Sequence, residues 1–348
     1  MTLRPVDGSP GPPWDRGLPG RLERLVVESE VLAGNPLGDP TRRPLYVFVP
    51  DGIADGERVP AIYVIQGMTG QLDMFFNRPA FEPTTFEWMC GAFADASVPR
   101  ALLVFVDAWT RFGGSQFVNS AGTGRYMDYL CDEVVPFVDS RYPTVAQPGA
   151  RGLTGKSSGG YGAMVVPMMR PDVFGALATH SGDALFEVCY LPDFRESARV
   201  LRDRYDGSVE RFVEDFETSE RFTVSDELLN SYTMALCYSP DEARPGTAVL
   251  PFDTATGALR DDVWERWLAW DPVRMVPKHA DALAGMRLVY VDAGTSDEYY
   301  LDLGAQAFSN ALTEHGIEHT LELFEGKHGR ITWRYPLAVK ALAGALDR

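Results

Sequence analysis

Residues 150–169 read ARGLTGKSSGGYGAMVVPMM, and the interpretation of the chain starts from this stretch. Its first part is a short apolar run typical of a buried strand, and its last part has helical spacing. Between them, Gly155, Ser157 and Gly159 fit the pattern G-x-S-x-G, which places a serine on a sharp strand-to-helix turn. The glycines let strand and helix approach closely, and the first amides of the helix would stabilise an oxyanion. The pattern predicts Ser157 as a nucleophile, although such matches also arise by chance in glycine-rich loops.

Outward from this stretch, short apolar runs alternate with segments of helical spacing. Two alternating runs within residues 21–50 predict an antiparallel pair of strands. Continuous runs typical of strands buried on both faces follow at 61–65, 101–107, 151–155, 175–182, 286–294 and 319–326. We therefore expect an α/β fold whose mostly parallel, doubly wound sheet carries helices on both sides.

One long segment interrupts the alternation. Residues 184–284 lie before the penultimate strand, are mostly of helical pattern and are too long for a loop, so they predict a helical insertion over one edge or end of the sheet. The spacing of Trp264, Trp267 and Trp270 within it favours core packing over a substrate-binding wall. We expect a single domain over residues 21–348, preceded by a Pro- and Gly-rich surface leader at 1–20.

Composition excludes several classes of protein. The 348 residues carry 32 Lys and Arg against 49 Asp and Glu, and the net charge of −17 disfavours nonspecific binding to nucleic acid or to an anionic membrane. The N-terminus lacks the apolar stretch of a secretory signal, and no run has the length of a membrane span, so we expect a cytoplasmic protein. The cysteines have no metal-site spacing and are expected to be buried free thiols: Cys90, Cys131, Cys189 and Cys237.

A serine nucleophile needs a histidine base that is itself oriented by an acid. Of five histidines, His328 follows the last predicted strand at its carboxyl end, where loops of such sheets reach the active site. His180 ends an earlier strand and is the main competitor, but as base it would precede the acid in the chain. His279, His315 and His319 fall at positions that we do not expect to reach the serine.

The acid is expected after the preceding strand, in the segment VYVDAGTSDEYYLD. Asp297 follows a Gly-Thr-Ser turn and could project toward His328, or it could be an ordinary helix N-cap. Asp292 lies within the strand and is expected to be a buried structural carboxylate. For the oxyanion hole, the amides of Ser158 and of Met68, in the loop IQGMTGQ, are the candidate donors.

These residues resemble the esterase D-like branch of the α/β-hydrolases, which includes S-formylglutathione hydrolases, feruloyl and acetyl-xylan esterases, siderophore esterases and the antigen 85 mycolyltransferases. The matching pieces run from about residue 40 to the C-terminus: GMTG at 67–70, RPAFE at 78–82, FVDAW at 105–109, MDYLCDEVVPFVDSRYPT at 127–144, GKSSGGYGAM at 155–164, GTSD at 294–297 and the G-x-H loop at 326–328. The resemblance implies an α/β-hydrolase fold with Ser157, Asp297 and His328 as the triad. Some members take the acid from the position of Glu298, so that alternative stays open.

The implied activity is that of a serine esterase, a carboxylic ester hydrolase that works through an acyl-enzyme on a small-molecule ester without metal or organic cofactor. An acyltransferase that passes the acyl group to an alcohol would have the same triad, and a noncatalytic binding protein on this fold would lack part of it. The loop WTRFGGSQFVNS offers Arg111, Gln116 and Asn119 for substrate binding, with a surface ion pair as the alternative for Arg111. The sequence leaves a homo-oligomer open.

Overall fold

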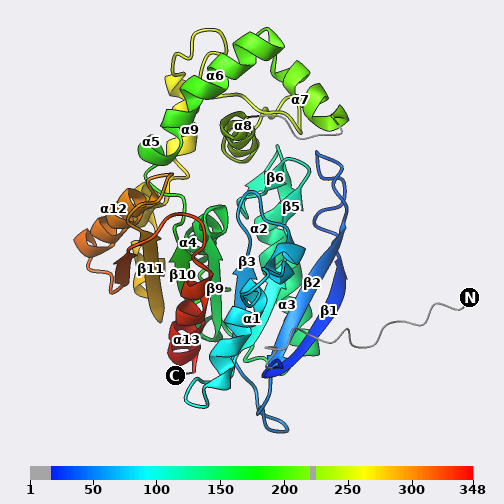
Figure 1. The fold of residues 1–348 in the computed structure, drawn as a ribbon, viewed down its shortest axis with the longest axis vertical. Coiled ribbons are helices and arrows are strands. Elements are labelled where there is room, and N and C mark those ends of the chain that lie inside the picture. Colours follow the sequence, from blue (N-terminus) through cyan, green and yellow to red (C-terminus); the bar gives the residue numbers. More distant parts are fainter. Residues whose placement is uncertain (1–16, 220–224, 348) are drawn as a thin grey trace, which may run out of the picture.

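The computed structural model describes residues 17–219 and 225–347 (Figure 1). An eight-stranded sheet with the order β1-β2-β4-β3-β9-β10-β11-β12 runs through the molecule. β1 pairs antiparallel with β2, and β2 pairs antiparallel with β4, whereas all further pairs are parallel. The strands are β1 (Gly20–Glu28), β2 (Arg42–Pro50), β3 (Ala61–Ile65), β4 (Leu102–Val106), β9 (Arg151–Lys156), β10 (Ala176–His180), β11 (Leu288–Gly294) and β12 (Thr320–Phe324). The expected α/β architecture is confirmed.

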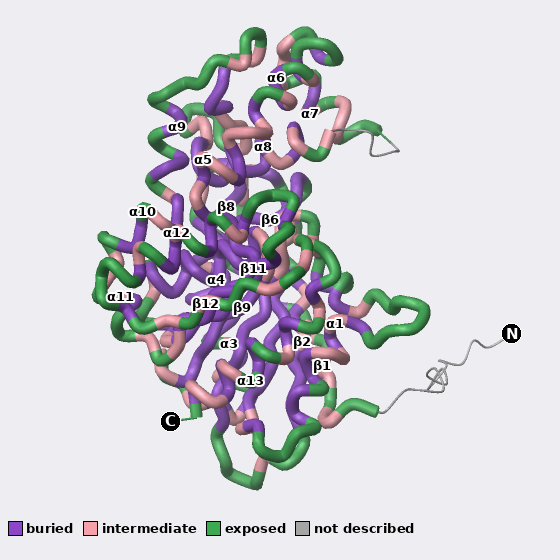
Figure 2. The backbone as a smooth tube through the Cα atoms, turned by 60° about the vertical axis from the view of Figure 1, so that its left-hand side comes forward, coloured by how far each residue is buried: buried purple, intermediate pink, exposed green. Residues whose placement is uncertain are grey.

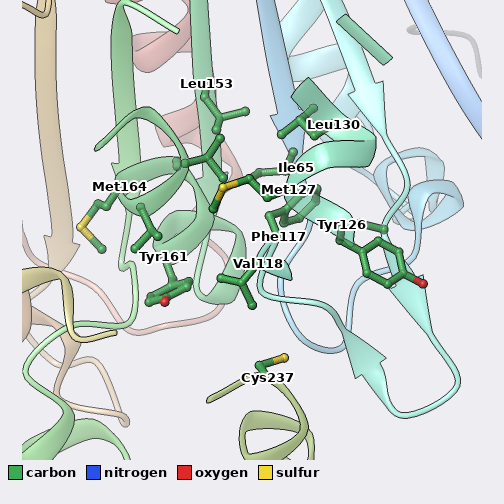
Figure 3. Packing of buried hydrophobic residues seen from close by; sticks show 14 of the residues in the cluster. Ile65, Phe117, Val118, Tyr126, Met127, Leu130, Leu153, Tyr161, Met164 and Cys237 are labelled. Carbon is green, nitrogen blue, oxygen red and sulfur yellow. The ribbon is translucent and has the colours of Figure 1, made fainter. Parts of the chain in front are cut away.

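Helices cover both faces of this sheet because alternate strand residues point to opposite sides. Tyr63 and Ile65 of β3 belong to the larger core, while Ile62 and Val64 belong to the smaller one. The larger core is completed by α3 (Val135–Arg141), α4 (Ser158–Met169) and α12 (Leu301–Glu314), and the smaller by α1 (Thr85–Cys90) and α13 (Tyr335–Leu346). Figure 3 shows a part of the larger core around α4, and Figure 2 shows that the burial is concentrated in the central strands.

Two local expectations need correction. The run at 319–326 does form a strand, but β12 is the last in the sheet order and all five of its residues are exposed or half-buried, so it is not buried on both faces. The loop after β4 holds regular structure that the sequence did not predict: β5 (Trp109–Thr110) pairs with β6 (Gly113–Gly114), and β7 (Asn119–Ser120) pairs with β8 (Gly124–Arg125).

Between β10 and β11 the chain is helical, with α5 (Phe186–Cys189), α6 (Leu191–Tyr205), α7 (Val209–Thr218), α8 (Asp226–Tyr238), α9 (Asp261–Leu268), α10 (Pro272–Met275) and α11 (Ala280–Ala284). In Figure 1, α5 to α9 stand above the carboxyl ends of the parallel strands. Trp264 and Trp267 are buried, which confirms core packing for these two residues. We refer to residues 184–284 as the helical insertion. Most of the expected leader, residues 1–16, lies outside the described residues.

The described residues contain no helix that is both long enough and apolar enough to span a bilayer. All four cysteines are buried and free, as the sequence predicts.

Candidate active site

Ser157 occupies the turn between β9 and α4 in a strained backbone conformation, with φ of 59° and ψ of −128°. Non-glycine residues with positive φ are uncommon, and they persist only where the surroundings hold them in place. Two hydrogen bonds do so: the Ser157 N–H donates to the carbonyl of His180 at 3.0 Å, and its carbonyl accepts from the Tyr161 amide at 2.8 Å. The arrangement is the strand-to-helix elbow that the sequence predicts.

The glycines on either side of Ser157 are required by close backbone packing. A Cβ atom added at Gly155 would lie 2.6 Å from the main chain of Gly159, and one added at Gly159 would lie 2.6 Å from the carbonyl oxygen of Ile65. Real Cβ atoms do not approach backbone atoms this closely. The elbow therefore depends on glycine at both positions.

His328 and Asp297 are brought together by two adjacent loops. His328 Nδ1 lies 2.9 Å from Asp297 Oδ2, the His328 side chain is 14% exposed and that of Asp297 is fully buried. This contact leaves Nε2 as the ring nitrogen available to a serine. The two loops are held in register because the amides of Thr295 and Ser296 donate to the carbonyls of Phe324 and Gly326.

Glu298, the alternative acid, contacts a different part of His328. Its carboxylate accepts the backbone N–H of His328 at 3.0 Å and pairs with Lys327 at 3.1 Å. The hydrogen bond from the His328 amide is the main cause that lowers the pKa of Glu298 to about 2. In this arrangement Asp297 orients the ring and Glu298 holds the main chain.

Ser157 Oγ makes no hydrogen bond to His328 within the described part of the chain. Catalytic hydrogen bonds are often long in the absence of substrate. The charged groups that act on Lys156 indicate that the elbow and the two loops lie close together. Burial lowers the pKa of Lys156, the residue before Ser157, while the charges of Asp297, Asp183 and Glu298 act in the opposite direction. The charge of Asp297 thus acts on the residue that directly precedes Ser157.

The candidate oxyanion donors lie beside the elbow. A Cβ added at Gly67 would be 3.3 Å from the Ser157 Cβ and 3.8 Å from the Ser158 amide nitrogen, so the loop of Met68 passes close to the elbow. Met68 is held by its carbonyl, which accepts the Gly114 amide at 2.8 Å. Ser158 is the first residue of α4, where a backbone amide has no acceptor within the helix.

His180, the competing base, is sealed in the protein. Its ring Nδ1 lies 2.9 Å from Asp292 Oδ1, and both side chains are fully buried. Asp292 also accepts from Arg334 at 2.8 Å, so it has the structural role expected from the sequence. His180 contacts the elbow through its backbone carbonyl.

The three expected substrate-binding residues lie in different surroundings. Arg111 is paired with Glu217 of α7 at 2.8 Å, and its backbone amide donates to Asp39. Gln116 is buried next to the elbow, with its Nε2 donating to the hydroxyl of Tyr238 at 2.8 Å. Asn119 Nδ2 donates to the Asp128 carboxylate, and its Oδ1 accepts the backbone amides of Met127 and Asp128.

Two side chains at the site were not predicted. Tyr299 packs its ring edge-to-face against His328, with centroids 4.8 Å apart. Asp183, in the loop after β10, accepts a hydrogen bond from the Ser158 hydroxyl at 2.9 Å. Its position after a parallel strand places it at the carboxyl edge of the sheet, and that is the one signal that could have identified it.

Residues 40–343 match the family model Esterase, described as "Putative esterase". The chain belongs to this esterase family. The description of this family agrees with the carboxylic ester hydrolase that the sequence predicts. A curated relative, the Bacillus subtilis (strain 168) protein named "Uncharacterized protein YbbA", is 24% identical over 170 residues, which cover 46% of this esterase and only 61% of YbbA.

Solved structures share the fold of this esterase at low sequence identity. A ferulic acid esterase has a TM-score of 0.59 and 16% identity, with 95% of this chain and 100% of that chain covered. An S-formylglutathione hydrolase from Agrobacterium tumefaciens has a TM-score of 0.57 and 14% identity over 95% and 97% of the two chains. The fluorophosphonate-binding serine hydrolase FphF from Staphylococcus aureus has a TM-score of 0.56 and 15% identity over 95% and 100%.

Proposed function

We propose that this esterase hydrolyses small-molecule carboxylic esters through a Ser157-His328-Asp297 triad and an acyl-enzyme intermediate. The observation that carries the proposal is the strained Ser157 elbow together with a histidine whose Nδ1 is held by a buried aspartate. Such a histidine has a fixed tautomer, with Nε2 free to accept the serine proton. Asp297 would stabilise the imidazolium that forms.

In the proposed mechanism, Ser157 Oγ attacks the ester carbonyl while His328 Nε2 takes its proton. The amides of Ser158 and Met68 would bind the oxyanion of the tetrahedral intermediate. His328 then returns the proton to the leaving alcohol, which departs and leaves the acyl group on Ser157. Water, deprotonated by His328, attacks this acyl group and releases the acid, and the proton returns to Ser157 Oγ.

The test is covalent labelling with an alkyl fluorophosphonate, a reagent class that the relative FphF binds. Attack by Ser157 Oγ forms a P–O bond and expels fluoride, so we expect one adduct on the peptide that contains residue 157, together with loss of p-nitrophenyl acetate hydrolysis. Ser157→Ala should give no adduct, and His328→Ala should label at least about 100-fold more slowly because the base is missing.

Ser140→Ala is the matched control. Ser140 lies on α3, and its hydroxyl donates to the carbonyl of Phe137. This variant should be labelled at the wild-type rate. Full labelling or turnover in Ser157→Ala would contradict the proposal.

A further inference from the structure

One carboxylate beside the elbow has no role in the proposed triad. Asp183 lies between β10 and α5, and one of its oxygens is saturated with hydrogen bonds. Oδ2 accepts from the hydroxyl of Tyr190 at 2.7 Å, from that of Ser158 at 2.9 Å and from Gln116 Nε2 at 3.4 Å. Three donors on one oxygen fix the orientation of the whole carboxylate.

The other oxygen of Asp183 accepts no hydrogen bond from the part of the chain that the structure describes. Oδ1 accepts no hydrogen bond from any residue in the ranges 17–219 and 225–347, and it is not among the side-chain atoms sealed from solvent, although Asp183 as a whole is only 6% exposed. Next to it, the oxygen of the Gln116 side chain is buried and also lacks a donor within those ranges. Acceptor oxygens in such an environment are costly to leave unpaired, and more so when charged.

The unpaired oxygen belongs to the same site as the triad. The positive charge of protonated His328 acts on Asp183, and the charge of Asp183 acts on Lys156. Burial is the main influence on Asp183 and raises its pKa, while the bonds from Tyr190 and Ser158 oppose this change. Asp183 is also one hydrogen bond away from Ser158, the residue whose amide would bind the oxyanion.

We propose that Asp183 Oδ1 binds a hydrogen-bond donor of the substrate, so that the site prefers esters that carry a hydroxyl or ammonium group close to the scissile carbonyl. This inference rests on the proposed function. A hydrogen-bond donor on the substrate would bind to Asp183 Oδ1. An apolar group in the same place would remove water from the carboxylate without providing a hydrogen bond in its place. Sites built to pair with a polar group reject apolar analogues much more strongly than apolar pockets reject polar ones.

The test compares esters that differ in one group. On the acyl side, the same carbon carries a hydroxyl, an ammonium or a methyl group in methyl 3-hydroxybutyrate, methyl 3-aminobutyrate and methyl 3-methylbutyrate, respectively. On the alcohol side, 2-hydroxyethyl butyrate carries a hydroxyl where propyl butyrate carries a methyl group. Hydrolysis is followed by pH-stat titration for wild type and Asp183→Asn. Comparing the kcat/KM ratio within each pair across the two proteins cancels the intrinsic reactivity of the esters.

In wild type we expect the donor-bearing member of at least one pair to be favoured, and in Asp183→Asn we expect that preference to fall about ten-fold, the effect of one hydrogen bond to a charged group. The asparagine oxygen would take over the bonds from Tyr190 and Ser158, which turns its NH₂ group toward the substrate. The hydroxyl and ammonium arms distinguish a neutral donor from a cationic one. Ratios that are the same in both proteins for every pair would overturn the inference.

Two further variants control for damage to the fold. Asp271 is fully buried and accepts the amides of Leu185 and Phe186, close to Asp183, and both of its oxygens are occupied by these bonds. Asp271→Asn should keep the wild-type ratios. Asp183→Ser provides a second removal of the carboxylate if the asparagine variant does not fold. A wild-type protein that hydrolyses none of the esters would contradict the proposed function. If wild type hydrolyses the esters and Asp183→Asn has the same kcat/KM ratios, only the inference about Asp183 is contradicted.

Discussion

Gly159 packs against the main chain that leads into the loop of Met68, and the Gly159→Ala variant tests whether this contact builds the site. The added Cβ would lie 2.6 Å from the carbonyl oxygen of Ile65 and 2.8 Å from the carbonyl carbon and oxygen of Gln66. These atoms are backbone and cannot rotate away. Overpacking of this kind costs about 3 kcal/mol, and the better helix propensity of alanine returns about 1 kcal/mol.

The net destabilisation of about 2 kcal/mol predicts a lower Tm. With an unfolding entropy of about 2.1 cal/mol/K per residue over 348 residues, Tm should fall by about 3 °C in a thermal unfolding experiment followed by circular dichroism. The strain is relieved by moving residues 65–68 away from Ser157. A displacement of about 1 Å at a reacting centre can reduce rates about 100-fold, so kcat/KM for p-nitrophenyl acetate should fall by about that factor.

Gly344→Ala is the control for the same chemical change. Gly344 lies on α13, and an added Cβ there would meet nothing within 4 Å. This variant should gain about 1 kcal/mol from helix propensity and keep its activity. If Gly159→Ala matched Gly344→Ala in both Tm and kcat/KM, the claim that backbone contact at the elbow positions the oxyanion loop would be refuted.

Three further predictions concern charged groups. Asp297→Asn should lower kcat for p-nitrophenyl acetate about 10⁴-fold, because His328 loses the charge that orients its ring. Glu298→Gln should lower kcat less than ten-fold, because the amide oxygen of glutamine can still accept the backbone N–H of His328. Arg111→Ala breaks an exposed pair with Glu217 and a longer contact, 3.8 Å, with the buried Asp39 carboxylate, so it should cost about 1 kcal/mol and leave the KM of monomethyl succinate and that of methyl butyrate at their wild-type values. A KM increase confined to the anionic ester would instead make Arg111 a substrate ligand. Burial raises the pKa of Asp193 from 3.8 to about 6, so between about pH 4 and 6 the native state keeps a proton that the unfolded state releases, and the contribution of Asp193 to stability falls as pH rises. In thermal unfolding measured across this pH range, Asp193→Asn should reduce the fall by about 1–2 kcal/mol. An unchanged pH profile would contradict the raised pKa of Asp193.

The parts of the site that the sequence predicts are those determined by local geometry. The Gly155-x-Ser157-x-Gly159 pattern requires a tight turn between a strand and a helix, and the structure has that turn with the expected positive φ. His328 and Asp297 follow two neighbouring parallel strands, β12 and β11, whose carboxyl ends must meet at one edge. The carboxyl ends of parallel strands meet at one edge, so the two loops could be expected to lie close together, whereas the contact between the Asp297 and His328 side chains is seen only in the structure.

The acid could not be chosen from the sequence alone, because adjacent residues in a loop differ only in the direction of their side chains. Asp297 and Glu298 are both within reach of His328, and the turn decides that one meets the ring and the other the backbone N–H. The exposure of β12 was missed for a related reason. An apolar run indicates that a segment forms a strand. Whether that strand lies in the middle or at the end of the sheet depends on its pairing with strands that are distant in the sequence.

The donors that hold Asp183 come from segments that are far apart in the chain, and this explains why its hydrogen bonds could not be predicted from the sequence. Tyr190 belongs to the helical insertion, Gln116 to the loop after β4, and Ser158 to the elbow itself. Tyr238, at the end of α8, adds a further bond to Gln116. The insertion therefore contacts the residues around the elbow through the hydroxyl groups of Tyr190 and Tyr238 as well as covering the sheet. A change at Tyr190 would therefore alter the substrate contact proposed for Asp183 without changing the elbow or the loops of His328 and Asp297.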